Sequence, residues 1–336
     1  MMDDIILLGH GSGGRLSHRL LDGVIIPILS GGSQPVQNDA AILEIPGGRI
    51  AYTTDSYVVD PLFFPGGDIG RLAVDGTVND LAMMGARPVA LAVGLIIEEG
   101  MGVSDLRRVL ESMRLAADEA GVSIVTGDTK VVPRGKGDRL FINTSGIGLF
   151  DHPYRPGGDR GRPGDLVIIS GTVGDHGVAV MTAREGLSLS TPVRSDVAPL
   201  ATMVRRLLER CGDGVHVLRD PTRGGVATTL KEIALQSSVD ITLDERSIPV
   251  SPAVAAVCSL LGLDPLYVAN EGKLLAIVDT SVANDALDAI KSDRFGGDAA
   301  IIGRVEKGDG TVRMVTTAGG TRRVDMLSGE QLPRIC

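Results

Sequence analysis

The chain has 336 residues, of which 43% are hydrophobic, enough for a packed core in each of about two domains. It carries 42 acidic residues against 33 lysines and arginines, and this net charge of −9 argues against nucleic acid or an anionic membrane as a partner. Its apolar runs are shorter than the roughly 18 residues of a membrane span, and its first residues contain two acids instead of the basic start of a signal peptide. We therefore expect a cytoplasmic protein. Three scattered cysteines exclude a disulfide framework and a cysteine zinc site.

The first candidate for a binding element is a glycine-rich run, GHGSGG at residues 9–14. Backbone of this kind can surround a phosphate with its N–H groups. The run lacks the Lys-Ser/Thr ending of a P-loop and the spacing of a dinucleotide-binding motif, so a flexible arm explains it equally well. Next, Asn38 and Asp39 stand before a strand expected over residues 42–45, where an acid can also belong to an ordinary turn.

Residues 51–88 combine several acids with a sequence that is otherwise suited to a core. The pattern predicts a strand over residues 50–54, a turn at residues 65–67 and a helix that begins after Asp68 and ends near Gly85. The carboxylate of Asp68 can accept hydrogen bonds from the N–H groups of the first helical turn and so cap the helix.

Asp75, Asn79 and Asp80 lie among the apolar residues of this expected helix. Burying unpaired carboxylates is costly, and a bound cation would remove that cost. Asp80 and Asp55, the residue just after the strand, are hard oxygen ligands of the kind that Mg²⁺ takes, and Mg²⁺ often accompanies phosphate groups. The alternative is a helix whose acidic edge faces solvent.

The remainder of the first half predicts a buried strand over residues 89–97, a helix over residues 103–120 that ends at Gly121, and strands over residues 122–125 and 140–149. The strand at 122–125 would deliver Asp128 and Lys130 at its carboxyl end, where α/β folds place ligands. Residues 151–165 are rich in proline, glycine and charge and are interpreted as a linker.

After the linker, apolar strands alternate with helices, which predicts a second α/β domain. The strands are expected at residues 166–170, 215–218, 239–243, 274–278, 299–305 and 312–316, and the helices at residues 196–211, 225–237, 252–261 and 282–291, with one more that ends near Glu185. The loop RDPTRGG at 219–225 offers guanidinium groups and helix N–H groups to an anion, and ANEGK at 269–273 offers a carboxylate in a glycine turn. Either loop could instead be an ordinary ion-paired turn.

The last residues, 329–336, end in a cysteine that no residue follows. Pro333 favours extended backbone for the residue before it, so the thiol of Cys336 would sit on an extended arm that can travel. The alternative is an ordinary solvent-exposed end. Cys211 and Cys258 fall in apolar helical patterns and are expected in the core.

Several of these motifs belong to a series that spans nearly the whole chain. The series is HGSGG at 10–14, TDSYVVDPLFFPGGDIG at 54–70, GTVNDLAMMGARP at 76–88, TGDTKVV at 126–132, GDHG at 174–177, RDPTRGG at 219–225, ANEGK at 269–273 and PRIC at 333–336. In this order it resembles the HypE family of carbamoyl dehydratases, the nickel–iron hydrogenase maturation factors. The terminal PRIC separates the chain from the wider superfamily of aminoimidazole ribonucleotide synthetase, selenophosphate synthetase and thiamine-phosphate kinase.

The resemblance implies an α/β fold of the aminoimidazole ribonucleotide synthetase type. Residues 1–150 would form a domain whose mixed sheet binds ATP and Mg²⁺ and pairs in a homodimer, residues 165–325 an α/β domain, and residues 326–336 a mobile tail with the acceptor cysteine. The site residues that the motifs imply are the metal and phosphate acids Asp39, Asp55, Asp80 and Asp128 and the nucleotide contacts Gly11, Ser12, Gly13, Gly14, Thr129 and Lys130. Many relatives carry two adjacent acids where this chain has Asn38 and Asp39, so the number of metal ions stays open.

The resemblance also implies a reaction. A carbamoyltransferase, HypF, would place a carbamoyl group on Cys336, and ATP would then be used to dehydrate the resulting thiocarboxamide to a thiocyanate. The carbamoyl oxygen would attack the γ-phosphate while a base, which we assign to Glu271, takes the N–H proton. Lys130 would contact the phosphates or the carbamoyl oxygen, and the cyanide would pass to a HypC–HypD scaffold. Two alternatives remain: a kinase or synthetase of the same superfamily that acts on a small molecule, and a docking factor without activity that only presents Cys336.

Overall fold

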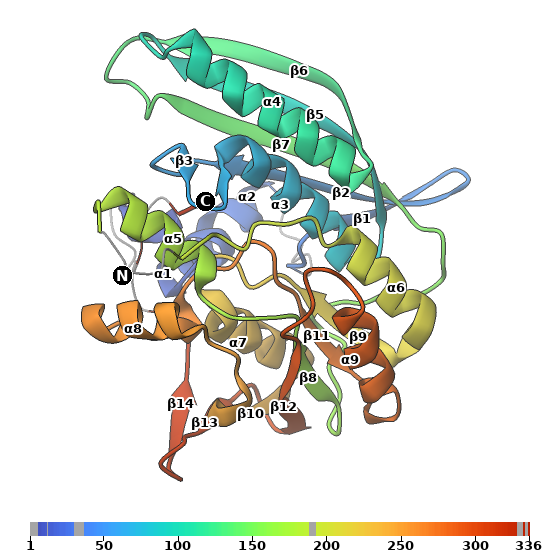
Figure 1. Cartoon of the computed structure of the whole chain (residues 1–336). Coiled ribbons are helices and arrows are strands. Elements are labelled where there is room, and N and C mark those ends of the chain that lie inside the picture. The colour runs from blue at the N-terminus through green and yellow to red at the C-terminus, as the bar shows by residue number, and fades with distance from the viewer. Residues whose placement is uncertain (1–5, 12, 30–36, 188–192, 328–331, 333–334) are drawn as a thin grey trace.

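The computed structural model of the chain describes residues 6–11, 13–29, 37–187, 193–327, 332 and 335–336, which form two main sheets with helices between and around them (Figure 1). The strand order in the first sheet is β1 (Ala41–Ile45), β2 (Gly48–Tyr57), β7 (Leu140–Leu149), β5 (Arg87–Glu98) and β6 (Ser123–Val132). Neighbouring strands are antiparallel except β5 and β6, which run parallel and are joined by the crossover helix α4 (Val103–Ala120).

The second sheet is built from the later part of the chain and carries helices on both faces. Its strand order is β14 (Thr321–Val324), β13 (Val312–Val315), β10 (Val239–Asp244), β12 (Ala300–Lys307), β8 (Leu166–Ile169), β11 (Leu275–Val278) and β9 (Val215–Arg219). Its helices are α5 (Asp175–Arg184), α6 (Ala201–Cys211), α7 (Gly225–Ser237), α8 (Pro252–Leu261) and α9 (Ala283–Lys291). Side chains alternate along β8, so that Val167 and Ile169 pack with α7 whereas Ile168 packs with α6 and α9.

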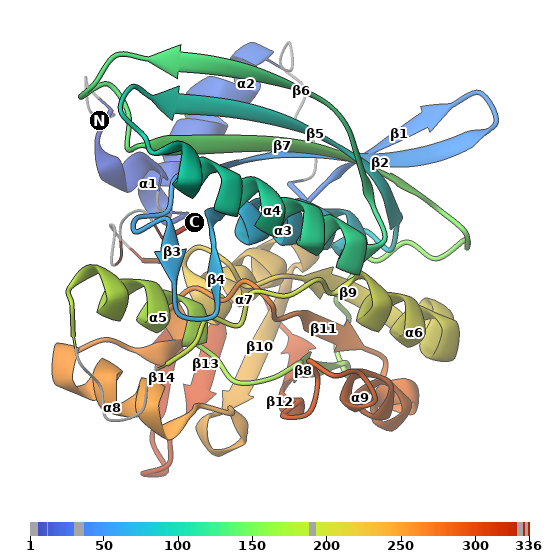
Figure 2. The same cartoon turned by 45° about the horizontal axis from the view of Figure 1, so that its top comes forward.

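The helix α3 (Ile69–Met83) lies between the two sheets (Figure 2). Leu72 packs in the core of the first sheet, whereas Met83 packs with α6 and α9 of the second, so α3 contributes to both cores. The expected cap is confirmed, because Oδ1 of Asp68 accepts hydrogen bonds from the N–H groups of Gly70 at 2.8 Å and Arg71 at 3.2 Å. A helix buried on all sides explains the apolar residues that surround its acids.

Shorter elements complete the described residues. They are the single-turn helices η1 (Leu8–Gly11), η3 (Gly212–Gly214), η4 (Glu245–Ser247), η5 (Pro265–Tyr267) and η6 (Thr280–Val282), the π-helical turn η2 (Leu21–Ile25), the helices α1 (Arg15–Leu20) and α2 (Ile26–Leu29), and the hairpin of β3 (Phe63–Phe64) and β4 (Gly67–Asp68). In the whole described part of the chain, no helix combines the length and the hydropathy that crossing a bilayer requires.

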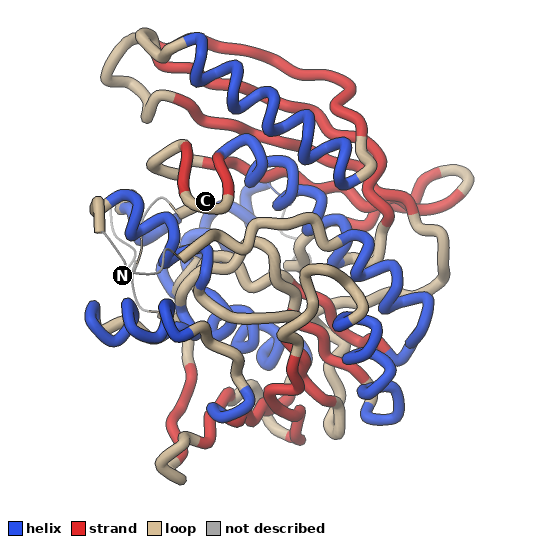
Figure 3. The backbone as a smooth tube through the Cα atoms, viewed as in Figure 1, coloured by secondary structure: helices blue, strands red, loops and turns tan. Residues whose placement is uncertain are grey.

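The sequence predicted most elements, and two differences matter for the site. The strand expected at 122–125 continues to Val132, because residues 126–132 pair with β5. The helix expected from Asp196 begins only at Ala201, and the loop before it runs along α3 (Figure 3). Pro199 disfavours helical backbone at the residue before it, and the side chain of Asp196 accepts a hydrogen bond from Glu271 instead of capping a helix.

A candidate active site between the two sheets

Four carboxylates from distant parts of the chain meet between the sheets. Asp39 precedes β1, Asp55 lies in β2, Asp80 in α3, and Asp220 follows β9. Burial raises the pKa of Asp80 well above its ordinary value, and the negative charges of Asp220, Asp55 and Asp39 raise it further. These four residues are called the acid cluster below. The hydroxyl of Thr53 lies 2.9 Å from Oδ2 of Asp80 and 3.0 Å from the main-chain oxygen of Asp39, which joins two of its members.

The acid cluster holds more negative charge than its surroundings offset. Burial raises the pKa of Asp39 to about 8 and that of Asp220 to about 6, and it also raises the pKa of Asp55. Arg219 lowers the first two values, and its Nε lies 2.7 Å from Oδ1 of Asp39. Among the described residues, however, Oδ2 of Asp39 has no hydrogen-bond partner. A set of carboxylate oxygens with such an orphaned atom fits a hard divalent cation such as Mg²⁺.

The sequence did not assign Asp220 to this cluster. It lies in the RDPTRGG loop, which offered two arginines and an acid and was interpreted either as an anion site or as an ion-paired turn. In the structure Arg219 joins Asp39 to Glu232, whose Oε2 lies 3.0 Å from the guanidinium. The loop is therefore both ion-paired and part of the site, and an acid directly after a strand was the signal that could have identified Asp220.

The glycine-rich run lies against the same loop and the start of the tail. Gly13 has a positive φ of 75°, and a Cβ there would lie 3.2 Å from the main-chain oxygen of Arg223. A Cβ on Gly14 would lie 2.7 Å from the main-chain oxygen of Leu327, so close packing excludes side chains at both positions. Gly11 accepts a hydrogen bond from Arg223 at 2.9 Å. Ser12 lies outside the described residues.

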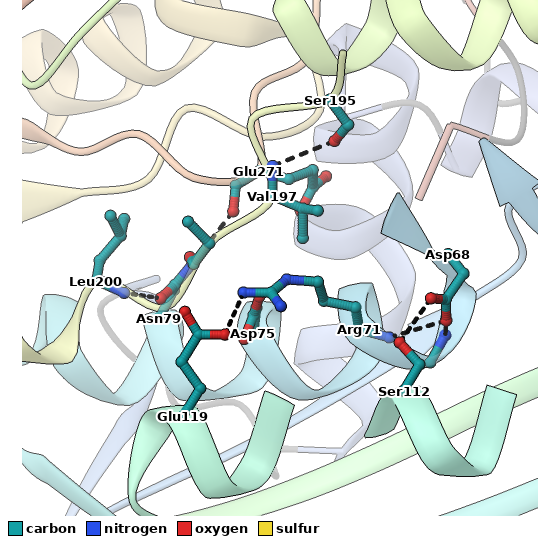
Figure 4. A network of polar contacts seen from close by, with 12 residues as sticks. Asp68, Arg71, Asp75, Asn79, Ser112, Glu119, Ser195, Val197, Leu200 and Glu271 are labelled. Carbon is teal, nitrogen blue, oxygen red and sulfur yellow. Dashed lines mark hydrogen bonds and ion pairs between the residues drawn. The ribbon is translucent and has the colours of Figure 1, made fainter. Parts of the chain in front are cut away.

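Glu271 is buried beside the cluster with its main chain held from two sides. Its N–H donates to Oδ1 of Asp196 at 3.1 Å, and its main-chain oxygen accepts from the side-chain amide of Asn79 at 3.2 Å (Figure 4). Within the part of the chain that the structure describes, Oε1 of Glu271 has no hydrogen-bond partner. Burial raises the pKa of Glu271 well above its ordinary value, and Asp220 and Asp196 add to the effect. A carboxylate whose pKa is raised is a stronger base than an ordinary one.

Neighbouring residues of the same motif fix the loops around Glu271. The side chain of Asn270 accepts a hydrogen bond from the N–H of Gly174 at 2.7 Å and donates to the main-chain oxygen of Pro221 at 3.0 Å. A Cβ on Gly272 would lie 1.8 Å from the main-chain oxygen of Asp196, so glycine is required there. Three motifs that stand far apart in the sequence, GDHG, RDPTRGG and ANEGK, are therefore parts of one site.

The end of the tail lies inside this site and not in solvent. Ile335 is buried, Cys336 is partly buried, and the N–H of Val58 donates to the main-chain oxygen of Cys336 at 3.2 Å. Burial raises the pKa of the Cys336 thiol to about 12, the positive charge of Arg223 lowers it, and the negative charge of Glu271 raises it. The alternative of a solvent-exposed terminal thiol is therefore wrong for the described residues. Cys211 and Cys258 are buried, as the sequence predicted.

Asp128, Thr129 and Lys130 do not join the acid cluster within one chain. They lie in the middle of β6 and not at its end, and all three are exposed, with Lys130 Nζ 2.6 Å from Oδ2 of Asp128. Hydrogen bonding to Lys130 lowers the pKa of Asp128. The register places Asp128 level with Gly94, Asn143 and Ser56 on one face of the sheet, whereas Asp55 is level with the buried Thr144 on the other.

The acids of α3 also have separate roles. Asp75 is paired with an arginine: Nε of Arg71 lies 3.1 Å from its Oδ2, and the same arginine pairs with Glu119 at 2.7 Å (Figure 4). Neither oxygen of Asp75 has a hydrogen-bond partner among the described residues. Burial raises the pKa of Asp75 to about 7 and Arg71 lowers it. Of the two acids of this helix, Asp80 belongs to the acid cluster and Asp75 pairs with Arg71.

Comparison with known proteins identifies what this arrangement resembles. Residues 37–150 match the family described as AIR synthase related protein, N-terminal domain, and residues 162–316 match its C-terminal domain. Carbamoyl dehydratase HypE of Rhizobium leguminosarum bv. viciae is 52% identical over 330 residues, which cover 98% of this chain and 94% of that protein. A crystal structure of HypE in complex with ATP is 51% identical with a TM-score of 0.84, over 99% of this chain and 100% of that one. A HypE–HypF complex is 48% identical with a TM-score of 0.87, over 92% and 99% of the two chains.

Proposed function

The chain belongs to the AIR synthase related proteins and, within them, to the HypE carbamoyl dehydratases, and from this membership we propose that it dehydrates a carbamoyl group on its own Cys336 in an ATP-dependent reaction. The thiocarboxamide R–S–C(O)NH₂ becomes the thiocyanate R–S–CN, and the carbamoyl oxygen leaves with the phosphoryl group that ATP transfers. The thiocyanate supplies a cyanide ligand in nickel–iron hydrogenase maturation. The main support is that the thiol of Cys336 lies in one buried region with Glu271, Asp55 and Asp220, whose charges all act on it.

Glu271 is the base in this proposal. The carbamoyl nitrogen loses two protons in total, one as its oxygen attacks the γ-phosphate and one as the C–O bond breaks and phosphate departs. The desolvated carboxylate of Glu271 has a raised pKa, so it accepts a proton readily when it is ionised. The hydrogen bonds from Asn79 and to Asp196 hold its main chain in place during both steps.

The acid cluster is the proposed metal site. Asp39, Asp55, Asp80 and Asp220 would hold Mg²⁺, which when bound offsets the charge of the ATP phosphates. Arg219 keeps Asp39 in place through its ion pair at 2.7 Å. The glycine-rich run would cover the phosphates, with Gly11 and Gly13 against Arg223 of the adjoining loop and Gly14 against Leu327. Ser12 stays part of this proposal although it lies outside the described residues.

The position of the thiol supports a tail that leaves and returns. A thiol with a pKa of about 12 is almost fully protonated at neutral pH, and the thiolate is the form that attacks a carbamoyl donor. Carbamoylation of Cys336 therefore requires the tail outside this site. The thiocarboxamide has no such ionisation, so its return into the buried site avoids the cost of burying a charged sulfur. Residues 326–336 are proposed to move between these two positions.

We also propose a homodimer that pairs through the first sheet. The face of this sheet turned away from α3 exposes a patch of large apolar side chains, which monomeric proteins rarely show. The exposed large apolar side chains on this face are Tyr52, Ile96, Val125, Ile147 and Leu149. Asp128 and Lys130 lie on this face, and the exposed Thr129 between them lies on the opposite face of β6. Pairing would bring them to the site of the partner subunit, which reconciles their exposure with the proposed contacts to phosphates or to the carbamoyl oxygen.

The partners follow the same proposal. The solved complex of a HypE with HypF supports HypF as the carbamoyl donor to Cys336. From the sequence we also propose a HypC–HypD scaffold as the acceptor of cyanide and a cytoplasmic location. No nucleic-acid or membrane partner is included in this proposal, which agrees with the net charge of −9.

The experiment that tests the function is intact-mass spectrometry of the full chain with HypF, carbamoyl phosphate, Mg²⁺ and ATP. We expect one carbamoyl adduct, followed by loss of one water from that adduct. Cys336→Ser should acquire no adduct, because serine is a far weaker nucleophile, whereas the control Cys258→Ser, which alters a buried thiol, should behave like the unaltered chain. Turnover of a diffusible substrate by Cys336→Ser would favour the small-molecule kinase or synthetase. ATP that is never hydrolysed would favour the docking factor.

A further inference from the structure

His176 belongs to the GDHG motif, and the proposed chemistry gives it no role. Its side chain is fully buried, and its ring packs edge-on against Phe64 with the ring centroids 5.4 Å apart. Neither of its two hydrogen bonds is to a carboxylate. Nδ1 lies 2.8 Å from Oγ of Ser195, and Nε2 lies 2.9 Å from the main-chain oxygen of Ile335, the residue before the terminal cysteine.

The partners of His176 determine which ring nitrogen carries the proton. The main-chain oxygen of Ile335 can only accept, so Nε2 must donate to it. The N–H of Val197 already donates to Oγ of Ser195 at 3.1 Å, which leaves the hydroxyl proton of Ser195 for Nδ1. Each polar atom of this relay has a partner, and burial lowers the pKa of His176, which favours the neutral ring that the relay requires.

The bond from His176 fixes the peptide group that carries Cys336. The main-chain oxygen of Ile335 lies in the same planar peptide unit as the nitrogen of Cys336. On the other side of the Cys336 Cα, the N–H of Val58 donates to the main-chain oxygen of Cys336. The main chain is thus fixed on both sides of this Cα. Of the two hydrogen bonds that fix it, the one from His176 comes from a side chain and the one from Val58 comes from the main chain.

We propose that His176 is a positioning residue that docks the C-terminal tail, so that the group carried on Cys336 is held beside Glu271 for dehydration. The inference rests on the proposed function for the identity of that group, but the docking itself does not. When the tail leaves the site so that Cys336 can reach the carbamoyl donor, the hydrogen bond between His176 and Ile335 breaks. The relay through Ser195, whose N–H also donates to the main-chain oxygen of Pro65 at 2.7 Å, ties the docking to the β3–β4 hairpin.

The test compares two variants of the full chain without nucleotide. His176→Phe keeps a planar ring beside Phe64 but removes the donor, whereas His176→Gln retains an N–H that can reach the oxygen of Ile335. Iodoacetamide labelling, followed by peptide mass spectrometry, measures how often Cys336 is exposed. We expect labelling of Cys336 to become about fivefold to tenfold faster in His176→Phe, as loss of one buried hydrogen bond predicts, and to stay near the original rate in His176→Gln.

Cys258 provides an internal control in the same samples. It packs with Val178 and Ala179 of α5, the helix that carries His176, so general loosening of this region would speed labelling of Cys258 as well. An unchanged rate at Cys336 in His176→Phe, or equal acceleration at Cys258, would overturn the docking role.

A second measurement separates this inference from the proposed function. With protein carbamoylated beforehand, single-turnover dehydration should be slower in His176→Phe than in His176→Gln, by at most the factor by which labelling accelerates, while carbamoylation by HypF should not slow. If the unaltered chain performs no dehydration, the proposed function fails while the labelling result still decides the docking. Faster labelling of Cys336 without slower dehydration would show that docking by His176 does not position the group for reaction.

Discussion

The side-chain amide of Asn79 donates to the main-chain oxygen of Glu271 at 3.2 Å, and this bond joins the helix α3 to a loop of the second sheet. The same amide donates to the main-chain oxygen of Ala198 at 3.0 Å, and its oxygen accepts from the N–H of Leu200 at 2.8 Å. Asp80 follows Asn79 directly, so these bonds also set the distance between the acid cluster and Glu271. A fully bonded, buried amide between two sheets keeps the proposed base and the proposed metal site in one rigid arrangement.

Two acids of α3 provide a matched pair of variants. Asp80→Asn should weaken Mg²⁺-dependent ATP binding about tenfold to hundredfold, because interactions with a charged group contribute about 1.5–3 kcal/mol. Asp75→Asn, one helical turn and a half away, should leave ATP affinity unchanged. Because burial raises the pKa of Asp75 to about 7, the folded protein disfavours its charged form, and removing the charge should not lower the free energy of unfolding at neutral pH. Titration calorimetry and thermal unfolding measure both. Equal ATP affinities in the two variants would remove Asp80 from the metal site.

Asp220 should affect both metal binding and the base. The negative charge of Asp220 raises the pKa of Glu271 beyond the effect of burial, so Asp220→Asn should lower that pKa. The proposed base acts in its ionised form, and the acid limb of the single-turnover dehydration rate should therefore move to lower pH at saturating Mg²⁺. Mg²⁺ affinity should fall as well. The exposed acid Asp285, which pairs with Arg210, provides the control Asp285→Asn, whose pH profile should match that of the unaltered chain. A profile that does not move in Asp220→Asn would contradict the electrostatic link.

Subunit mixing tests whether Lys130 acts across the dimer. Glu271→Gln alone should retain ATP binding and lose about 10² to 10⁴-fold in dehydration rate, as loss of a general base predicts. Lys130→Ala should also be strongly impaired. If each site takes Glu271 from one subunit and Lys130 from the other, an equal mixture of the two variants should regain about a quarter of the original sites, because half of the dimers are mixed and each has one intact site. A mixture as inactive as its components would place both residues in one subunit or deny the role of Lys130.

The buried thiol predicts an unusual pH dependence of alkylation. With a pKa raised by burial to about 12, the thiolate fraction of docked Cys336 should rise about tenfold for each pH unit from pH 7.5 to 9.5, without levelling off near pH 9 as an exposed cysteine does. Iodoacetamide rates measured by mass spectrometry over this range give the profile. A plateau near pH 9 would show that the tail is released in most molecules. A short peptide with the sequence of the last residues supplies the reference profile of an exposed thiol.

The sequence alone determined the local elements, since their causes lie within a few residues. The helix at 103–120 follows from its apolar period and ends at Gly121, whose φ of 71° is the left-handed conformation that glycine adopts easily. Asp68 caps α3 because a carboxylate at that position reaches the N–H groups of the first turn. The order of motifs likewise identified the family and implied Asp39 and Glu271 as site residues, whereas Asp55 and Asp80 follow from the chemistry of acids in an apolar segment.

Only the tertiary structure decided which of these residues meet. Asp220 lies in the acid cluster. Asp128 and Lys130 lie on the other face of the first sheet, because β6 continues to Val132, beyond the short apolar run from which the sequence predicted the strand. His176 contacts Ile335 although 159 residues separate them, and Asn79 contacts Glu271 across 192. Such contacts depend on how two sheets pack around one buried helix. Local propensity and side-chain period carry no information about that packing, because they describe how a segment folds and not which distant segment lies against it.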